Sequence, residues 1–412
     1  MLVESKKGKM NKKKYLIVLS AILLLSGGCS SSGENIEQTT EQERAKTVDV
    51  DKLYSANKEY LAQPYWNQAC DYIKKTDNGY YFIDGNLLYF WDSAVQEGTV
   101  VCSAPNCDHQ GSYCNAYIGS YGDENQYGFV KTGMEIYNDH IYMLGYEMGD
   151  VMDFYIYQIS MDGSEREKLA YLYTNEKDAT GGFMWTYDWI MVNGYYYGAY
   201  DGEDGTYGLE KICLDGTRES VYDMSNLDTP NISLIKGYNH DVYFTTEWKA
   251  DEGNGNYVFR LMKYNIDTGK TETLLENFKG NDYCLTDENH IFYYDINNDC
   301  YLIDLTTKEE ILVADDMNQL SAVTSDGNYV YLCDYENVYV YDFDGMLTDT
   351  IPCPSATVLF GDGEYLFVEA FQEPGTDVEK EGGTMHMWVL DKSQIGSEHK
   401  QWMKMELGSY SN

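Results

Sequence analysis

Apolar and polar residues alternate along most of this chain in short runs that are separated by turn-forming residues. One stretch shows the pattern in full. Asn193-Gly194 leads into the aromatic run Tyr195 to Tyr197, and the alternating run Leu209 to Leu214 ends at Asp215-Gly216, before a third run, Thr217 to Tyr222. Alternation with a period of two predicts β-strands, and Asn-Gly or Asp-Gly between such runs predicts tight turns.

The same unit recurs about seven times. The turns that lead into its aromatic strand begin at Asn78, Asn138, Asn193, Asn239, Glu288, Asp326 and Asp362. An apolar run before each turn, such as Trp185 to Val192, predicts one more strand, so each copy forms four antiparallel strands. A repeat of this kind predicts an all-β fold, a β-propeller of seven four-stranded blades. Six or eight blades are the alternatives if a terminal copy is partial.

The first residues predict an export signal rather than part of the fold. Lys6 to Lys14 are rich in lysine, Tyr15 to Leu25 are apolar, and Ser26-Gly27-Gly28 precede Cys29. A basic region, a short apolar core and small residues are typical of a signal peptide, here 1–28. The small residues before a cysteine resemble the lipobox of bacterial lipoproteins, although Ser26 stands where a larger apolar residue is usual. The resemblance implies lipid attachment at Cys29, and a plain signal peptide is the alternative.

The rest of the chain divides by composition. Residues 29–66 comprise the lipid-attachment cysteine and a polar segment that predicts a flexible tether. Residues 67–407 predict the propeller, and residues 408–412 a short tail. We therefore expect an extracytoplasmic protein that its lipid anchors to the outer face of the cell membrane.

The charge of the chain limits its partners. Removing residues 1–28 takes away six Lys and one Glu, which leaves 23 basic and 67 acidic residues and a formal charge of −44. Such a charge repels nucleic acid and anionic lipid. It suits an acidic solvated surface, a cationic partner or bound Ca²⁺. We expect a monomer.

Loop length separates the two faces of the predicted propeller. The links between the second and third strands of a blade, and those between blades, share one face, which we call the loop face; the remaining turns form the turn face. Long segments gather on the loop face: Gly145 to Asp153, Tyr200 to Tyr207, Glu247 to Asn256, Phe371 to Thr384, and the link Cys102 to Phe129. Because variable loops on a rigid scaffold carry binding, we expect the binding surface on this face, over blades one to four.

The loop face offers candidate binding residues. They are the aromatic residues Trp185, Tyr200, Tyr207 and Trp248, which could stack on a sugar or a peptide, and the acidic residues Asp201, Asp204 and Asp251. The alternative is that the aromatic side chains only pack the loops.

A cluster of cysteines and a histidine lies in the longest link. Cys102, Cys107, His109 and Cys114 could close a tetrahedral structural Zn²⁺ site. Outside the cell, disulfides are the competing expectation: Cys107 with Cys114, and Cys102 with Cys70. Free thiols are the third alternative. Each of the first two arrangements would have a structural role.

Other chemical motifs are weak. Asp295, Asn297 and Asp299 match the opening of a Ca²⁺ loop, but Cys300 replaces its glycine, so a hairpin turn is the better interpretation. The acidic run around Asp201 and Asp204 is a second weak Ca²⁺ candidate. His140, His240 and His290 occupy nearly the same position in three repeats, which predicts turn residues on the turn face.

Two of the turns carry a resemblance to a known family. Met161-Asp162-Gly163-Ser164-Glu165 and Leu214-Asp215-Gly216-Thr217-Arg218 resemble the blade hairpins of receptor-type, YWTD-like propellers. The whole chain is similar to uncharacterised propeller lipoproteins of clostridia and related Firmicutes, and this resemblance implies fold and location only. We expect a cell-surface binding module without enzymatic activity. The alternatives are a glycan-active hydrolase or lyase that uses channel carboxylates, and a scaffold subunit of an envelope complex.

Overall fold

The computed structural model describes residues 73–119, 127–129, 133–149, 151–175, 189–201, 207–225, 231–250, 257–317, 320, 322–334, 336–353, 357–361, 364–370 and 386–407. All of these described residues belong to one compact unit. The expected signal peptide, Cys29, the tether and Cys70 lie outside the described residues. No helix in the described part is long and apolar enough to span a bilayer.

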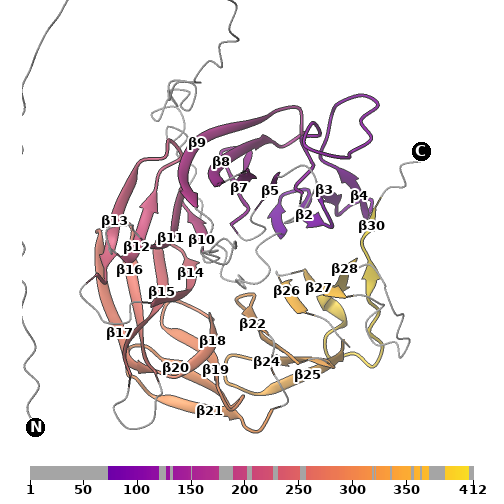
Figure 1. Cartoon of the computed structure of the whole chain (residues 1–412). Helices are drawn as coiled ribbons and strands as arrows, with labels where there is room; N and C mark the ends of the chain where they lie inside the picture. Colours follow the sequence, from indigo (N-terminus) through magenta and orange to yellow (C-terminus); the bar gives the residue numbers. More distant parts are fainter. Residues whose placement is uncertain are drawn as a thin grey trace, which may run out of the picture. The chain divides into compact units, whose positions relative to one another are not determined.

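Seven sheets surround a common centre in the described part of this unit (Figure 1). Blade one holds β1 (Ile73–Thr76), β2 (Gly79–Asp84), β3 (Leu87–Asp92) and β4 (Glu97–Val100); blade two holds β5 (Tyr127–Phe129), β6 (Glu135–Tyr137), β7 (His140–Met148), β8 (Met152–Ser160) and β9 (Arg166–Asn175). Blade three holds β10 (Trp189–Val192), β11 (Tyr195–Asp201), β12 (Tyr207–Ile212) and β13 (Arg218–Asp223); blade four holds β14 (Asn231–Tyr238), β15 (Asp241–Ala250), β16 (Tyr257–Asn265) and β17 (Lys270–Phe278).

The remaining blades follow the same plan. Blade five holds β18 (Gly280–Leu285), β19 (His290–Asp295), β20 (Cys300–Asp304) and β21 (Glu310–Ala314); blade six holds β22 (Ala322–Ser325), β23 (Val330–Cys333), β24 (Asn337–Tyr341) and β25 (Leu347–Pro352). Blade seven holds β26 (Thr357–Gly361), β27 (Tyr365–Ala370), β28 (His386–Asp391) and β29 (Met403–Lys404), with the 3-10 helix η3 (Lys392–Gln394) after β28. Neighbouring strands within each blade are antiparallel and in chain order. The prediction of an all-β propeller with seven blades is confirmed.

The second strand of each sheet, such as β2, β19 or β23, is largely buried on both faces because it packs between two neighbouring blades. In β7, Ile141 and Met143 belong to the core shared with blade one, whereas Tyr142 and Leu144 belong to the core shared with blade three. Successive side chains of a strand point to opposite faces, so a strand buried on both sides needs apolar residues at every position. This is why the aromatic strands read as nearly continuous apolar runs.

The C-terminal segment closes the ring. After β29, the chain continues into β30 (Glu406–Leu407), which pairs in parallel with β4 at the outer edge of blade one. Met405, between β29 and β30, is 2% exposed, and its amide donates to the carbonyl oxygen of Met387 at 3.0 Å. Inside, the rings of Tyr80 and Phe367 lie 4.7 Å apart across the same junction. Blades one and seven are therefore joined through their second strands, β2 and β27, and at the outer edge of blade one.

Buried ion pairs join neighbouring blades at other junctions. The ammonium of Lys74 in β1 lies 3.1 Å from the carboxylate of Glu135 in β6, and that of Lys236 in β14 lies 2.6 Å from Asp282 in β18. Lys236 is 2% exposed and its side chain also donates to the carbonyl oxygen of Tyr283. Charges removed from water in this way need a partner, and here the partner comes from the next blade.

Some expected loops are strands instead. In blade two, β7 and β8 pair as far as Met148 and Met152, so the expected loop Gly145 to Asp153 shrinks to a tight connection. In blades three and four the strands reach Asp201 and Ala250. The link from blade one also ends earlier than expected, because β5 pairs with β7 as the first part of the inner strand of blade two. Burial explains the longer pairing in blade two, since Tyr146 and Phe154 fill the interblade core there.

Candidate metal centre and the cavity beside it

The predicted cysteine and histidine cluster comes together in the structure. Cys102, Cys107, His109 and Cys114 each offer one ligand atom, and these four atoms all lie within 4.8 Å of one another. Nδ1 of His109 is 3.5 Å from Sγ of Cys114. Tetrahedral zinc with Zn–S of about 2.3 Å and Zn–N of about 2.0 Å places sulfur and nitrogen about 3.5 Å apart. The cluster can therefore hold a metal ion.

Tight turns in the segment 102–117, which we call the cluster loop, bring these side chains together. The amide of Cys107 donates to the carbonyl oxygen of Ala104 at 3.4 Å, and that of Cys114 to Gly111 at 3.1 Å. Asn106 and His109 have φ values of 59° and 56°, in the left-handed region. Such backbone conformations are uncommon outside glycine, and they reverse the chain twice between Cys102 and Cys114.

Blade two holds the C-terminal half of the cluster loop. The guanidinium of Arg166, the first residue of β9, donates to the carbonyl oxygens of Cys114 at 2.9 Å and Tyr117 at 3.0 Å, and also to Ser112. On the other side, the amide of Leu88 in β3 donates to Ala116 at 2.9 Å. The loop is thus fastened between blades one and two.

The thiols of the cluster are not joined to one another. Cys102, Cys107 and Cys114 are free, so the expected disulfide between Cys107 and Cys114 is not formed in this structure. The alternative partner of Cys102, Cys70, lies outside the described residues. Burial, with a smaller contribution from the neighbouring Cys102, raises the pKa of the Cys114 thiol to about 12. A bound cation would offset both effects, because it stabilises the thiolate form.

A cavity of about 590 Å³ opens beside the cluster on the loop face. It lies where the hairpin between β2 and β3 meets the cluster loop and the start of β28. Its lining residues are Asp84, Gly85, Asn86, Leu87, Tyr89, His109, Gln110, Gly111, Tyr117 and His386. His109 is the one residue of this set that also belongs to the metal cluster.

Two of the aromatic residues expected to bind ligand, Tyr200 and Tyr207, are not among the residues that line this cavity. Tyr207 begins β12, and its hydroxyl accepts a hydrogen bond from the amide of Ile232 at 3.0 Å, so it joins blade three to blade four. Tyr200 lies in β11, and its ring occupies the space beside Gly208 in the paired strand. These contacts fit the packing alternative. Asp201 and Trp248 lie in strands β11 and β15, whereas Trp185, Asp204 and Asp251 lie outside the described residues.

The expected histidine turns are confirmed. Nδ1 of His140 is 2.9 Å from the carbonyl oxygen of Asn138, and Nδ1 of His290 is 2.8 Å from the carboxylate of Asp287. His240 lies 3.1 Å from Asp267 in the next turn of the same blade. Each ring therefore fastens a turn. The Asp295 turn is likewise a hairpin, since its carboxylate accepts from the amides of Asn297 and Asp299 at 2.8 and 3.1 Å.

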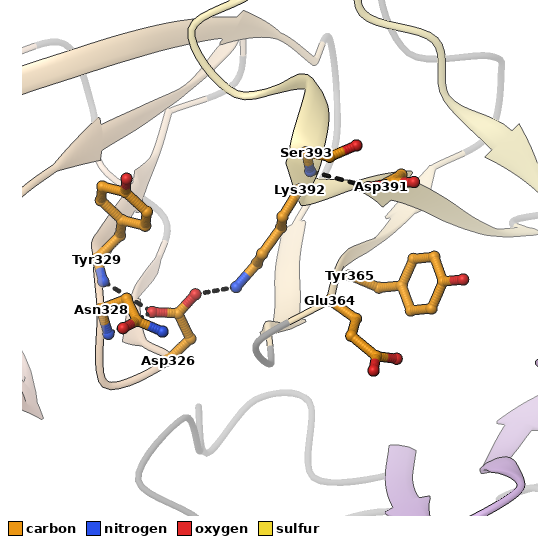
Figure 2. A pocket seen from close by; sticks show the side chains of 8 residues that line it. All are labelled: Asp326, Asn328, Tyr329, Glu364, Tyr365, Asp391, Lys392 and Ser393. Carbon is orange, nitrogen blue, oxygen red and sulfur yellow. Dashed lines mark hydrogen bonds and ion pairs between the residues drawn. The ribbon is translucent and has the colours of Figure 1, made fainter.

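The turn face has a cavity of its own, of about 530 Å³, between blades six and seven. Figure 2 shows Asp326 and Lys392 reaching toward each other across it as an ion pair. The same carboxylate accepts from the amide of Tyr329 at 2.7 Å and from the hydroxyl of Tyr331 at 2.7 Å. The Asp326 side chain is 1% exposed, and its contact with Lys392 joins the two blades. We therefore interpret this site as structural.

Sequence reasoning missed most of the cavity on the loop face. The hairpin Asp84 to Leu87 resembles any short turn, and nothing local to it signals that the cluster loop folds over it. The pairing of Leu87 with Tyr117 brings them together across a long stretch of chain. The one available signal was the length of the link that contains the cysteines.

Comparison with known proteins gives only distant structural likenesses. No protein-family model matches the chain, and no curated protein matches its sequence. Among solved structures, an oligogalacturonate lyase from Vibrio parahaemolyticus is 13% identical, with a TM-score of 0.43 over 66% of this chain and 76% of the other. A puromycin hydrolase mutant is 11% identical, with a TM-score of 0.47 over 88% and 56%. PorZ, a surface component of the type-IX secretion system of Porphyromonas gingivalis, is 10% identical, with a TM-score of 0.43 over 85% and 39%. Likenesses this distant carry no information about what this chain does or binds.

Proposed function

We propose that this protein is a binding module that takes its ligand in the loop-face cavity between blades one and seven. The observation that carries the proposal is the construction of that cavity. The hairpin at Asp84, the cluster loop and the start of β28 come from distant parts of the chain and converge on it. Concave sites that several rigid elements build together at a junction are typical of small-ligand binding.

The composition of the cavity favours binding over catalysis. Asp84 is the one carboxylate among its described lining residues, whereas glycoside hydrolysis usually requires two. Asn86 and Gln110 add amides that both donate and accept hydrogen bonds. A glycan or a peptide that exposes polar groups fits this set better than an anionic ligand does, since the mature chain is strongly acidic.

The signal-like N-terminus supports a location outside the cytoplasm. Residues 1–28 and Cys29 have the order of a lipoprotein signal and its lipid-attachment site. The proposed protein is thus a monomeric propeller that a lipid on Cys29 anchors to the outer face of the membrane. The resemblance to propeller lipoproteins of Firmicutes points to the same location.

We propose Zn²⁺ as the metal of the cluster. Three thiolates and one imidazole form a soft, tetrahedral ligand set that selects zinc over calcium or magnesium. Four protein ligands leave no open position, which is typical of structural zinc. Ca²⁺ on the acidic loops has less support, because the backbone of its own turn occupies the Asp295 carboxylate.

A binding screen tests the proposed function. The full chain, purified with zinc, is applied to glycan and peptide arrays, and each hit is measured by calorimetry. Gln110→Ala should weaken binding about 10-fold, because it removes a polar contact in the cavity. Gln401→Ala is the matched control, since Gln401 is exposed on blade seven away from this cavity, and it should bind like the original chain.

Two results would contradict the proposal. Equal binding by the Gln110→Ala and original chains would place the ligand elsewhere. Release of shortened glycan products during the assay would show an enzyme in place of a binding module.

A further inference from the structure

We propose that the metal centre and the loop-face cavity form one linked unit, in which metal binding assembles the wall of the cavity and His109 belongs to both. The inference rests on the proposed zinc site and ligand cavity, and it adds a mode of regulation: metal occupancy controls ligand binding.

The cavity wall lies between two metal ligands along the chain. His109, Gln110 and Gly111 line the cavity, and all three lie between the ligands Cys107 and Cys114. A metal that joins these two cysteines closes a short loop around the wall residues. Closing a loop removes conformational freedom from every residue inside it.

The His109 ring presents one nitrogen to the cluster and the other away from it. Nδ1 faces Sγ of Cys114 at 3.5 Å, so Nε2 lies on the edge of the ring that is turned away from that thiol. A metal on Nδ1 leaves the proton on Nε2, because a neutral imidazole carries one proton. The ring then offers a fixed hydrogen-bond donor, and His109 lines the cavity. The matching ligand group is an acceptor oxygen, such as a hydroxyl or a carbonyl.

The two halves of the cluster loop are held to different degrees. Its C-terminal half is held by Arg166 and by the pairing of Leu88 with Ala116. Ser103 to Asn106 and Asp108 are exposed, in the half that leads to the wall. The φ value of 56° at His109 adds a backbone conformation that the surroundings must maintain. Metal coordination on both sides of this residue supplies that constraint.

Linkage makes the effect reciprocal. If the metal favours the conformation that the ligand needs, the ligand strengthens metal binding by the same factor. Linkage of this kind typically changes affinity about 5-fold to 150-fold.

Hydrogen exchange with the metal alone tests the inference. The full chain is stripped of metal under reducing conditions and measured by mass spectrometry before and after addition of Zn²⁺. At free Zn²⁺ of about 100 times its Kd, any opening that releases the metal becomes about 100-fold rarer, and exchange through it slows equally. We expect this slowing at the amides of residues 108–111, with no change in β23 of blade six.

Two variants separate the metal site from its link to the cavity. Cys107→Ser should lose the metal and the protection together. His109→Cys should keep a four-thiolate site, visible as the charge-transfer bands of bound Co²⁺, and keep the protection at residues 110–111. His109→Cys should also lower the affinity for any ligand found on the arrays, because it removes the Nε2 donor.

The outcomes distinguish the two proposals. Absence of Co²⁺ bands in the original chain would overturn the zinc site itself. Normal bands without slower exchange at residues 108–111 would overturn the link and leave the zinc site standing. Equal ligand affinity with and without zinc would also overturn the link.

Discussion

Arg166 illustrates how one side chain can support the candidate metal centre from a neighbouring blade. Its guanidinium donates to the carbonyl oxygens of Ser112, Cys114 and Tyr117, and so fixes the backbone beside one ligand. A lysine has a single ammonium and cannot reproduce this planar set of donors. The orientation of Cys114 thus depends on a residue of the next blade.

Arg166→Lys should lower the affinity for zinc about 10-fold, the effect typical of groups that orient metal ligands. Competition with a chromogenic chelator measures it. Arg260→Lys is the control, because Arg260 pairs with the exposed Glu276 and should leave zinc affinity unchanged. An unchanged affinity in Arg166→Lys would show that the loop holds its shape without this contact.

The ion pair between Lys236 and Asp282 makes a second prediction at this scale. Lys236→Met removes one partner and leaves a largely buried carboxylate, so it should lower the free energy of unfolding by about 3–5 kcal/mol. Lys211→Met is the control, since its partner Glu219 is exposed, and it should cost less than about 1 kcal/mol. Urea unfolding measures both, and equal costs would contradict the structural role of the buried pair.

At the scale of elements, the end of the chain closes the ring through a very short strand. β30 adds only Glu406 and Leu407 to the edge of β4, so most of the closing energy must come from packing. Met405 supplies it, because its side chain lies in the core that blades one, two and seven share.

Met405→Ala should therefore lower the free energy of unfolding by about 2–5 kcal/mol, the usual cost of emptying such a site. Met346→Ala provides a matched control, since Met346 is 66% exposed and its loss should change stability by less than about 0.5 kcal/mol. If the two variants unfold at the same urea concentration, the packing of Met405 does not stabilise the closed ring.

Element by element, the sequence predicted strands better than it predicted loops. The turns at Asn193 and Asp215 were readable because turn residues interrupt an alternating pattern locally. The pairing of Gly145 to Met148 was not, because it depends on what a neighbouring blade needs for its core. The cluster was visible as a spacing of cysteines, whereas the cavity depends on a contact between Leu87 and Tyr117 that no local pattern encodes.

At the scale of the whole molecule, buried tyrosines predict sensitivity to alkali. Burial, aided by the charge of Asp162, raises the pKa of Tyr81 to about 12. The unfolded chain has the usual value near 10, so it loses the proton first. The contribution to stability is complete below about pH 10 and is lost as the pH rises to about 12.

Tyr81→Phe should flatten this loss by up to about 1.4 kcal/mol per pH unit across that window. Urea unfolding at pH 9 and pH 11 measures the difference for both chains. Burial also raises the pKa of Tyr142, Tyr197, Tyr243, Tyr293 and Tyr341, so the variant should remain sensitive to alkali, but less so. Identical slopes for the two chains would contradict the assignment to Tyr81.

Native mass spectrometry of the full chain, purified without added metal or reductant, tests the central claim most directly. Our account predicts one zinc ion per chain, retained through buffer exchange and lost in Cys107→Ser, because Cys102, Cys107, His109 and Cys114 bind it together. A metal-free chain that is lighter by two hydrogens, with Cys107 joined to Cys114 in a peptide digest, would contradict it.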